Sequence, residues 1–153
     1  TDDDGNHTFF ALAVPVIEER KIPVTSFVIT GMYEERLDEK YEYVNYQSHS
    51  DDMHKSGASG KGAMVNWSYN DIVNDLNSSK NKIESHTGNT CNIFCYPFGH
   101  YNDTAIKALE DTGFSLAFTV EGGRVKAGLN KLKLPRVRVN GNTSITEFKN
   151  SVK

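Results

Sequence analysis

Apolar positions along the chain follow two patterns that alternate. Runs of β-branched and aromatic residues predict strands at residues 24–30, 43–47, 92–96, 114–120 and 134–139. Apolar residues at helical spacing predict helices within residues 10–21, 68–88, 103–113 and 144–152. Because strands alternate with helices, the chain is expected to form an α/β domain with a mainly parallel sheet.

Local signals indicate where the predicted helices begin. Capping motifs, with an acid three positions after the cap, start at Ser68 and Ser144, and Asp103 can cap a further helix. Pro15 lies inside the first helical segment and predicts a kink or a late start. Residues 49–62 are polar and rich in glycine and serine, which is typical of a loop.

Polar clusters fall where strands are expected to end, at residues 49–54 and 97–100, and at residues 2–4 if a strand leads into them. In parallel α/β sheets the functional groups gather at the carboxyl ends of the strands. These three clusters are therefore the first places to look for chemistry.

Composition and charge exclude several classes of function. The 153 residues suffice for one domain with a real core, and 17 basic against 20 acidic residues leave a net charge near −3 with no basic stripe, so nucleic acid is not an expected partner. No apolar run approaches the roughly 18 residues of a membrane span. Cys91 and Cys95, about 13 Å apart on one strand, are too distant for a mutual disulfide and are expected to be small buried residues.

Two histidines and two aspartates could form a metal site. His49 and His54 lie five positions apart, which suits a strand end followed by a tight turn; two solvated loop histidines are the alternative. Asp3 or Asp4 can add a carboxylate, and two histidines with one carboxylate form a catalytic set for Zn²⁺ or another divalent first-row metal. The second aspartate then stays free as a base.

Other catalytic motifs do not fit. Residues 57–60 lack the spacing of a serine-hydrolase elbow, and residues 60–61 lack the remainder of a phosphate-binding loop. Residues 2–5 lack the alternating ligands of an EF-hand.

Several segments resemble the motifs of the polysaccharide deacetylases, the NodB-type carbohydrate esterases. Residues 1–5 (TDDDG) resemble the family's TFDDG opening, and residues 49–54 (HSDDMH) resemble its second motif with the spacing of the poly-N-acetylglucosamine deacetylase branch. Residues 96–99 (YPFG) are similar to the YPYG variant of its third motif. Residues 112–114 (TGF) and 134–136 (LPR) follow in the expected order, so the resemblance extends over nearly the whole chain.

The resemblance implies a distorted, incomplete (β/α) barrel forming a single catalytic domain over residues 1–153. It implies that Asp3 is the general base and that Asp4, His49 and His54 hold a divalent metal, Zn²⁺ first and Co²⁺ or Ni²⁺ otherwise. A metal-activated water would remove N-acetyl groups from an N-acetylglucosamine polymer such as peptidoglycan, exopolysaccharide or chitin. A polymer substrate of this kind implies an extracellular or cell-surface enzyme; the oligomeric state is open.

The third motif is expected to contact the substrate. Pro97 has no N–H, so the backbone of Phe98 is the natural donor to the oxyanion. Tyr96 could shape the pocket for the acetyl group.

The chain departs from the family pattern at three places. Asp2 replaces an aromatic residue, and we expect tolerance because its side chain should alternate away from Asp3. Cys95 stands where many members carry an arginine that pairs with the base. Arg136 can supply that pairing from the last strand, or else is a solvated strand arginine. The general acid is unassigned, with Asp3 itself and His100 as candidates.

Two other functions stay open, an O-acetyl xylan esterase with the same metal chemistry and a degenerate domain that only binds carbohydrate. The resemblance also suggests that residues 2–4 end a truncated first strand. On that basis Asp3 and Asp4 are expected to be held less firmly than His49 and His54.

Overall fold

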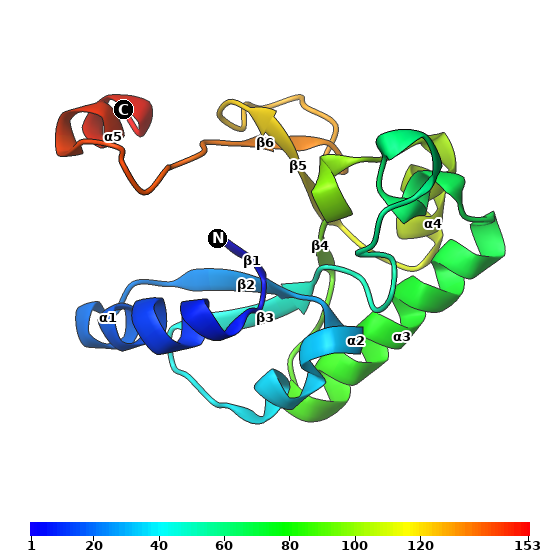
Figure 1. The fold of residues 1–153 in the computed structure, drawn as a ribbon, viewed down its shortest axis with the longest axis horizontal. Helices are drawn as coiled ribbons and strands as arrows, with labels where there is room; N and C mark the ends of the chain where they lie inside the picture. Colours follow the sequence, from blue (N-terminus) through cyan, green and yellow to red (C-terminus); the bar gives the residue numbers. More distant parts are fainter.

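Six parallel strands form one sheet in which the spatial order of the strands follows the chain (Figure 1). The computed structural model describes the backbone of residues 1–153 and every side chain except that of Ser59. The strands are β1 (Asp2–Asp4), β2 (Val24–Val28), β3 (Val44–Ser48), β4 (Ile93–Cys95), β5 (Leu116–Gly122) and β6 (Leu134–Arg136). This repeated strand–crossover–strand order confirms the predicted α/β class.

Helices lie in the crossovers from β1 to β5, whereas the connection from β5 to β6 has no helix among the described residues and the last helix follows β6. The α-helices are α1 (Val14–Arg20), α2 (Thr30–Tyr33), α3 (Tyr69–Thr87), α4 (Asp103–Asp111) and α5 (Ile145–Ser151). A π-helical turn, η1 (Phe9–Ala13), precedes α1, and the 3₁₀ turns are η2 (Glu34–Asp38), η3 (Ala58–Gly60), η4 (Ala63–Asn66) and η5 (Pro97–Gly99). The sequence pattern missed α2 and η2, which are too short to show a periodicity.

The sheet curls into a partial barrel. Phe27 on β2 and Phe118 on β5 have ring centroids 5.9 Å apart although two strands lie between them. In a flat sheet three strand spacings would separate them by roughly 14 Å. The concave face therefore closes on itself, as the predicted incomplete (β/α) barrel requires.

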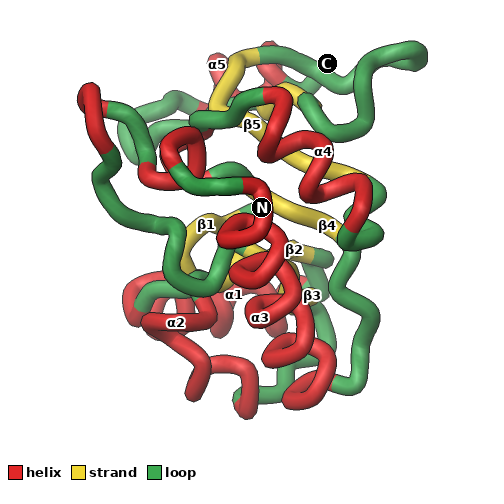
Figure 2. Tube along the Cα trace, turned by 90° about the vertical axis from the view of Figure 1, so that its right-hand side faces the viewer, coloured by secondary structure: helices red, strands yellow, loops and turns green.

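The main apolar core lies on the other face of the sheet, under the helices. Figures 1 and 2 show the helices outside the strands, and the buried residues of α1, α3 and α4 form one cluster with Val28, Tyr46 and Phe94 of the sheet. The helix pattern follows from this packing, because Ile72, Leu76 and Ile83 recur along one side of α3.

Capping residues explain where the helices begin. Ser68 accepts the N–H of Asp71, and Ser144 and Glu147 form a reciprocal capping box, as expected. The prediction for α4 is off by one residue, because Asn102 and not Asp103 caps it. α1 directly continues the π-helical turn η1, so helical backbone runs through Pro15, which lies in the first turn of α1.

The last helix lies apart from the core. α5 sits at the end of a long connection (Figure 1), and its apolar residues Ile145, Phe148 and Val152 are exposed. Arg124 donates hydrogen bonds to the carbonyl oxygens of Asn150 and Ser151 at its C-terminal end. None of the described helices combines the length and apolar character that crossing a membrane requires.

The position of the core predicts how two leucines differ. Leu76→Ala should lower the free energy of unfolding by about 2–5 kcal/mol, because Leu76 is 0% exposed and its removal leaves a cavity. Leu12→Ala is the matched control, since Leu12 is 72% exposed and its loss should change stability by less than about 0.5 kcal/mol. Urea unfolding of both variants measures the difference, and equal effects would contradict this assignment of the core.

Candidate active site

The carboxyl ends of four strands bring the chemically active side chains together. Asp3 and Asp4 end β1, His49 follows β3, Cys95 ends β4 and Arg136 ends β6. In a parallel sheet these ends lie at one edge, which explains why residues distant in sequence converge.

Asp4, His49 and His54 form a compact group of ligand atoms. The Nε2 atoms of both histidines lie 3.4 Å from Oδ1 of Asp4, and one ligand atom from each residue lies within 4.8 Å of the others. Such a set of two imidazoles and one carboxylate suits a divalent first-row metal and leaves coordination positions open. The donor chemistry and the spacing therefore fit the expected metal.

The surrounding protein orients both histidines. Nδ1 of His49 donates to the carbonyl oxygen of Cys95 at 2.8 Å, which directs Nε2 toward Asp4 as the atom that could bind a metal. The ring of His54 stacks on Phe98 with centroids 4.3 Å apart.

The pKa shifts of His54 and Asp4 favour the protonation states that bind a cation. Burial, followed by the charge of His49, lowers the pKa of His54, which favours the neutral imidazole that metals bind. A hydrogen bond with His49 is the main cause that lowers the pKa of Asp4, so its carboxylate is ionised.

Asp3 is paired with Arg136 across the open side of the sheet. Nη1 and Nη2 of Arg136 donate to Oδ1 and Oδ2 of Asp3, both at 2.7 Å, and Nε donates to the carbonyl oxygen of Thr119 at 3.1 Å. A bidentate guanidinium–carboxylate pair is short, strong and fixed in orientation. The structure thus brings the strand arginine to the aspartate, as the sequence allowed.

The contact with Arg136 lowers the pKa of the Asp3 carboxyl. Burial alone would raise the pKa of this carboxyl, but the hydrogen bonds from Arg136 and the charges of His49 and Arg136 outweigh burial and hold the pKa below its ordinary value. The carboxylate is therefore ionised at neutral pH and stays available as a proton acceptor beside Asp4.

Cys95 lies beside the Asp3–Arg136 pair. Its Sγ is 3.5 Å from Oδ2 of Asp3 and 3.2 Å from Nη2 of Arg136. Asp3, His49 and Cys95 could also hold a metal by spacing, but burial and the charge of Asp3 raise the pKa of the Cys95 thiol. A protonated thiol beside a guanidinium is a poorer cation site than the group around Asp4. Both cysteines are free and buried, as predicted.

Among the three opening acids, Asp2 lies where a negative charge is least favourable. Burial, then repulsion by Asp3 and Asp4, raises its pKa to about 7, and its Oδ2 atom is buried without a hydrogen-bond partner among the described residues. It pairs with Ser26 in the register of β1 and β2. The departure from the family motif thus adds a partly protonated acid and leaves the arrangement of Asp3 and Asp4 intact.

The third motif contributes one exposed ring to the site. Phe98 is 44% exposed and adopts a left-handed backbone (φ 57°), an unfavourable conformation that the structure maintains beside His54. Pro97 is buried beneath it. Tyr96 was expected to shape the pocket, but it lies in the core. It is 1% exposed, and its hydroxyl donates to the carbonyl oxygen of Leu132.

A cavity adjoins Asp3 on the side of β5 and β6. It has a volume of about 380 Å³, and its wall includes Asp3, Arg136, Val120 and Val137. His100, the candidate acid, is engaged elsewhere, since its Nδ1 accepts the N–H of Gly62 at 2.9 Å. The cavity offers room for a substrate group next to Asp3.

Comparison with known proteins identifies the family. A family model described as polysaccharide deacetylase matches residues 1–117. The chain belongs to the polysaccharide deacetylase family. The matched residues include β1 to β4, and so Asp3, Asp4, His49 and His54.

Relatives and solved deacetylases agree with this assignment. The poly-beta-1,6-N-acetyl-D-glucosamine N-deacetylase of Staphylococcus aureus (strain MRSA252) is 26% identical over 152 residues, covering 90% of this chain and 52% of the relative. The chain spans about half the length of the curated relatives it matches.

Two solved structures share the fold. Streptococcus pyogenes deacetylase PplD, solved in complex with acetate, has a TM-score of 0.87 at 21% identity, over 99% of this chain and 68% of that chain. IcaB from Ammonifex degensii has a TM-score of 0.82 at 24% identity, over 98% of this chain and 69% of that chain. They confirm the incomplete (β/α) barrel of polysaccharide deacetylases.

The Asp3–Arg136 pair predicts a titration effect in the metal-free protein. Arg136→Met should raise the pKa of Asp3 above its value in the wild type, because the hydrogen bonds and charge of Arg136 no longer oppose the effect of burial. The wild-type pair should stabilise the fold above pH 3.8 and lose that contribution as pH falls through the lowered pKa. Carboxyl ¹³C NMR titration measures the shift.

Arg138→Met is the matched control, because Arg138 is an exposed cation two residues further along the same segment. Its removal should leave the titration of Asp3 nearly unchanged. An Asp3 pKa that is the same in both variants would contradict the proposed dependence on Arg136.

Proposed function

We propose that this chain is the catalytic domain, residues 1–153, of a metal-dependent polysaccharide N-deacetylase. The observation that carries the proposal is the ionised carboxylate of Asp3 beside the Asp4–His49–His54 group. A deacetylase needs a metal site and a proton acceptor side by side, and this edge of the sheet supplies both.

Asp4, His49 and His54 would hold the metal, for which we propose Zn²⁺. When bound, the cation would supply Lewis-acid polarisation and promote ionisation of water at neutral pH. Asp3 accepts the proton of the attacking water, while Arg136 fixes the orientation of its carboxylate. The same carboxyl then returns a proton to the departing nitrogen, so the C–N bond breaks into acetate and an amine.

The third motif would complete the site. The backbone N–H of Phe98 would stabilise the developing oxyanion, with Pro97 shaping the turn. The exposed ring of Phe98 gives a sugar ring an apolar surface beside His54. Tyr96 would contribute by supporting this turn from the core.

We propose an N-acetylglucosamine polymer as the substrate, and within that class a β-1,6-linked chain. The names of the relatives support this choice, since they are poly-β-1,6-N-acetylglucosamine N-deacetylases. Such a polymer lies outside the cell, so we place the enzyme at the cell surface or beyond it.

The base is tested by Asp3→Asn. The variant should bind zinc like the wild type but release acetate from β-1,6-linked N-acetylglucosamine oligomers about 10²–10⁴-fold more slowly, because the amide cannot accept the proton. Asp103→Asn, at an exposed acid on α4, is the control and should keep full activity. Undiminished acetate release by Asp3→Asn would remove Asp3 from the mechanism.

Metal removal tests the ligand set. A chelator should abolish acetate release and added Zn²⁺ should restore it, whereas His54→Ala should not respond to Zn²⁺ at concentrations that saturate the wild type. His7→Ala, at an exposed histidine outside the site, should behave like the wild type. Activity that survives complete chelation would refute the metal-dependent mechanism. Release from acetylated xylan alone would favour the O-acetyl esterase, and no release despite zinc binding would favour a carbohydrate-binding domain.

A further inference from the structure

The two histidines of the metal site are connected by the segment 50–53. His49 is fixed by the sheet, because its N–H donates to the carbonyl oxygen of Val28 at 3.0 Å and its ring to that of Cys95 at 2.8 Å. His54 follows only after segment 50–53. The path of that segment therefore decides where the second imidazole lies relative to the first.

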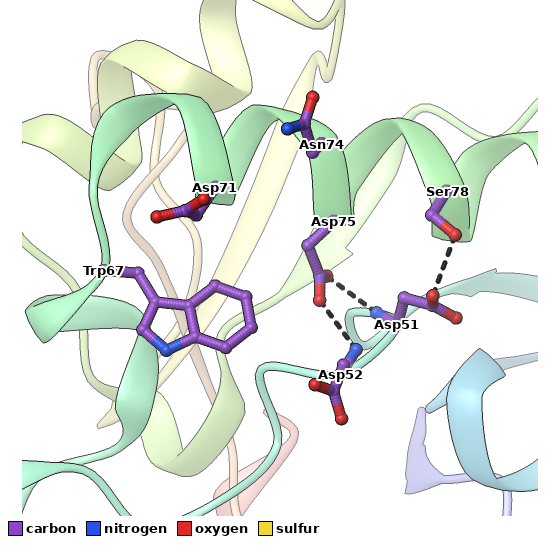
Figure 3. A pocket seen from close by; sticks show the side chains of 7 residues that line it. All are labelled: Asp51, Asp52, Trp67, Asp71, Asn74, Asp75 and Ser78. Carbon is purple, nitrogen blue, oxygen red and sulfur yellow. Dashed lines mark hydrogen bonds between the residues drawn. The ribbon is translucent and has the colours of Figure 1, made fainter.

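One carboxylate on α3 holds the middle of this segment. The N–H of Asp51 donates to Oδ1 of Asp75 at 2.8 Å, and the N–H of Asp52 donates to Oδ2 at 2.7 Å. Figure 3 shows the Asp75 side chain pointing from the helix to these two backbone nitrogens. Because both oxygens are used on consecutive amides, the contact fixes two successive peptide planes.

The position of Asp75 within α3 is unusual for an acid. It is 7% exposed and lies on the buried side of the helix with Ile72 and Leu76. Burial raises the pKa of Asp75 to about 6, which measures how poorly the site suits a charge. A buried carboxylate destabilises a fold unless hydrogen bonds compensate for its lost hydration. For Asp75, the N–H groups of Asp51 and Asp52 provide these hydrogen bonds.

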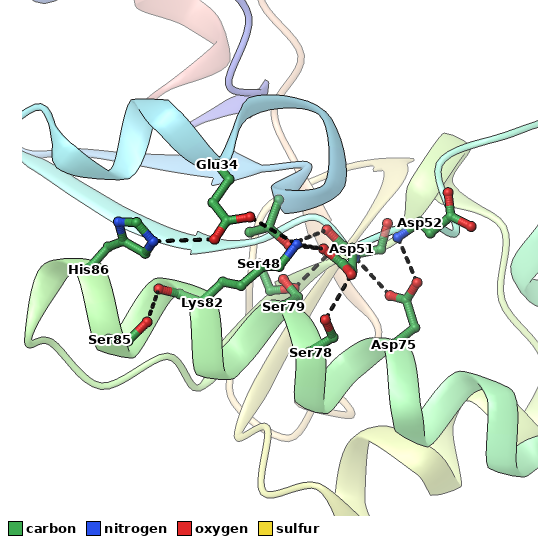
Figure 4. A network of polar contacts seen from close by, with 12 residues as sticks. Glu34, Ser48, Asp51, Asp52, Asp75, Ser78, Ser79, Lys82, Ser85 and His86 are labelled. Carbon is green, nitrogen blue, oxygen red and sulfur yellow. Dashed lines mark hydrogen bonds and ion pairs between the residues drawn. The ribbon is translucent and has the colours of Figure 1, made fainter.

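The side chain of Asp51 fastens the same segment a second time. It accepts hydrogen bonds from Thr30 at 2.7 Å, from Ser78 at 2.8 Å and from Lys82 at 3.0 Å. Lys82 in turn lies 3.0 Å from Glu34 (Figure 4). The segment between the histidines is thus held to α3 and α2 by groups that do not touch the metal ligands.

We propose that Asp75 is a positioning residue of the metal centre, which fixes the backbone between the two histidines so that both Nε2 atoms converge on Asp4. The inference rests on the proposed metal site and deepens it. Its claim is about metal affinity, which can be measured without substrate.

Asp75→Asn tests the proposal with little change in volume. The amide keeps one oxygen acceptor but turns two donors toward the N–H of Asp51 or Asp52, so one of the two bonds is lost. We expect the dissociation constant for Zn²⁺ to rise about 10–100-fold, the usual effect of removing a group that orients metal ligands. Isothermal titration with Zn²⁺, at a temperature where circular dichroism shows the variant folded, gives this value.

Asp71→Asn is the matched control. Asp71 lies one turn earlier on α3 and lines a surface cleft together with Asp75 (Figure 3), but its side chain accepts a hydrogen bond from Ser68 at the start of the helix. Its zinc affinity should stay within about twofold of the wild type. A purely structural role for Asp75 would lower the melting temperature equally with and without zinc, whereas a positioning role also shrinks the rise in melting temperature that zinc causes.

Two further outcomes are decisive. If Asp75→Asn does not fold, Asp75→Glu replaces it, because it keeps the carboxylate and displaces it by one methylene; its zinc affinity should also fall. Unchanged zinc affinity in a folded Asp75 variant would overturn the proposal. A wild type that binds zinc but releases no acetate would refute the deacetylase function and leave the role of Asp75 standing.

Discussion

The bond between Asp3 and Arg136 joins the two edges of the sheet. β1 and β6 lie at opposite ends of the strand order, and a flat sheet would hold them roughly 24 Å apart. The observed 2.7 Å contacts exist only because the sheet curls, and the Phe27–Phe118 contact inside the curl shows the same closure. The charge of the proposed base is therefore a property of the whole barrel, since it depends on a cation from the opposite edge.

This dependence separates the site into two parts with different supports. The Asp4–His49–His54 group belongs to β1 and β3 and to the segment that α3 holds. The Asp3–Arg136–Cys95 group spans β1, β4 and β6 across the concave side. Adjacent residues Asp3 and Asp4 link the two parts, so in the proposed function one short strand serves both the metal and the base.

Much of the fold follows from local patterns. The continuous apolar run of β2 and the capped amphipathic segment of α3 are strong signals, and both elements appear where expected. The short α2 has no such pattern, because four residues cannot show a helical period. The predicted last helix, α5, is present, but its apolar residues are exposed, since amphipathicity alone does not supply a partner.

The site residues that belong to a recognisable sequence motif could be predicted. Those that reach the site only through the three-dimensional arrangement of the strands could not. Asp4, His49 and His54 were expected as one group and lie together. Arg136 could only be offered as one of two alternatives, because sequence does not show that the last strand meets the first. Tyr96 was expected at the pocket, but strand alternation turns it into the core. Asp75 gave one unused signal, an acid on the apolar side of a helix.

The positions of the proposed metal ligands Asp4, His49 and His54 along the chain have a consequence for folding. They lie within residues 4–54, whereas the Asp3–Arg136 contact joins positions separated by 133 residues. Closing the longer loop costs about 0.9 kcal/mol more in chain entropy, and contacts of high sequence separation form slowly. The proposed metal ligands can thus come together once β1 to β4 and α3 have formed, before β6 closes the sheet. The proposed base gains its arginine partner only when β6 reaches β1, so in the proposed mechanism hydrolysis would require the closed sheet.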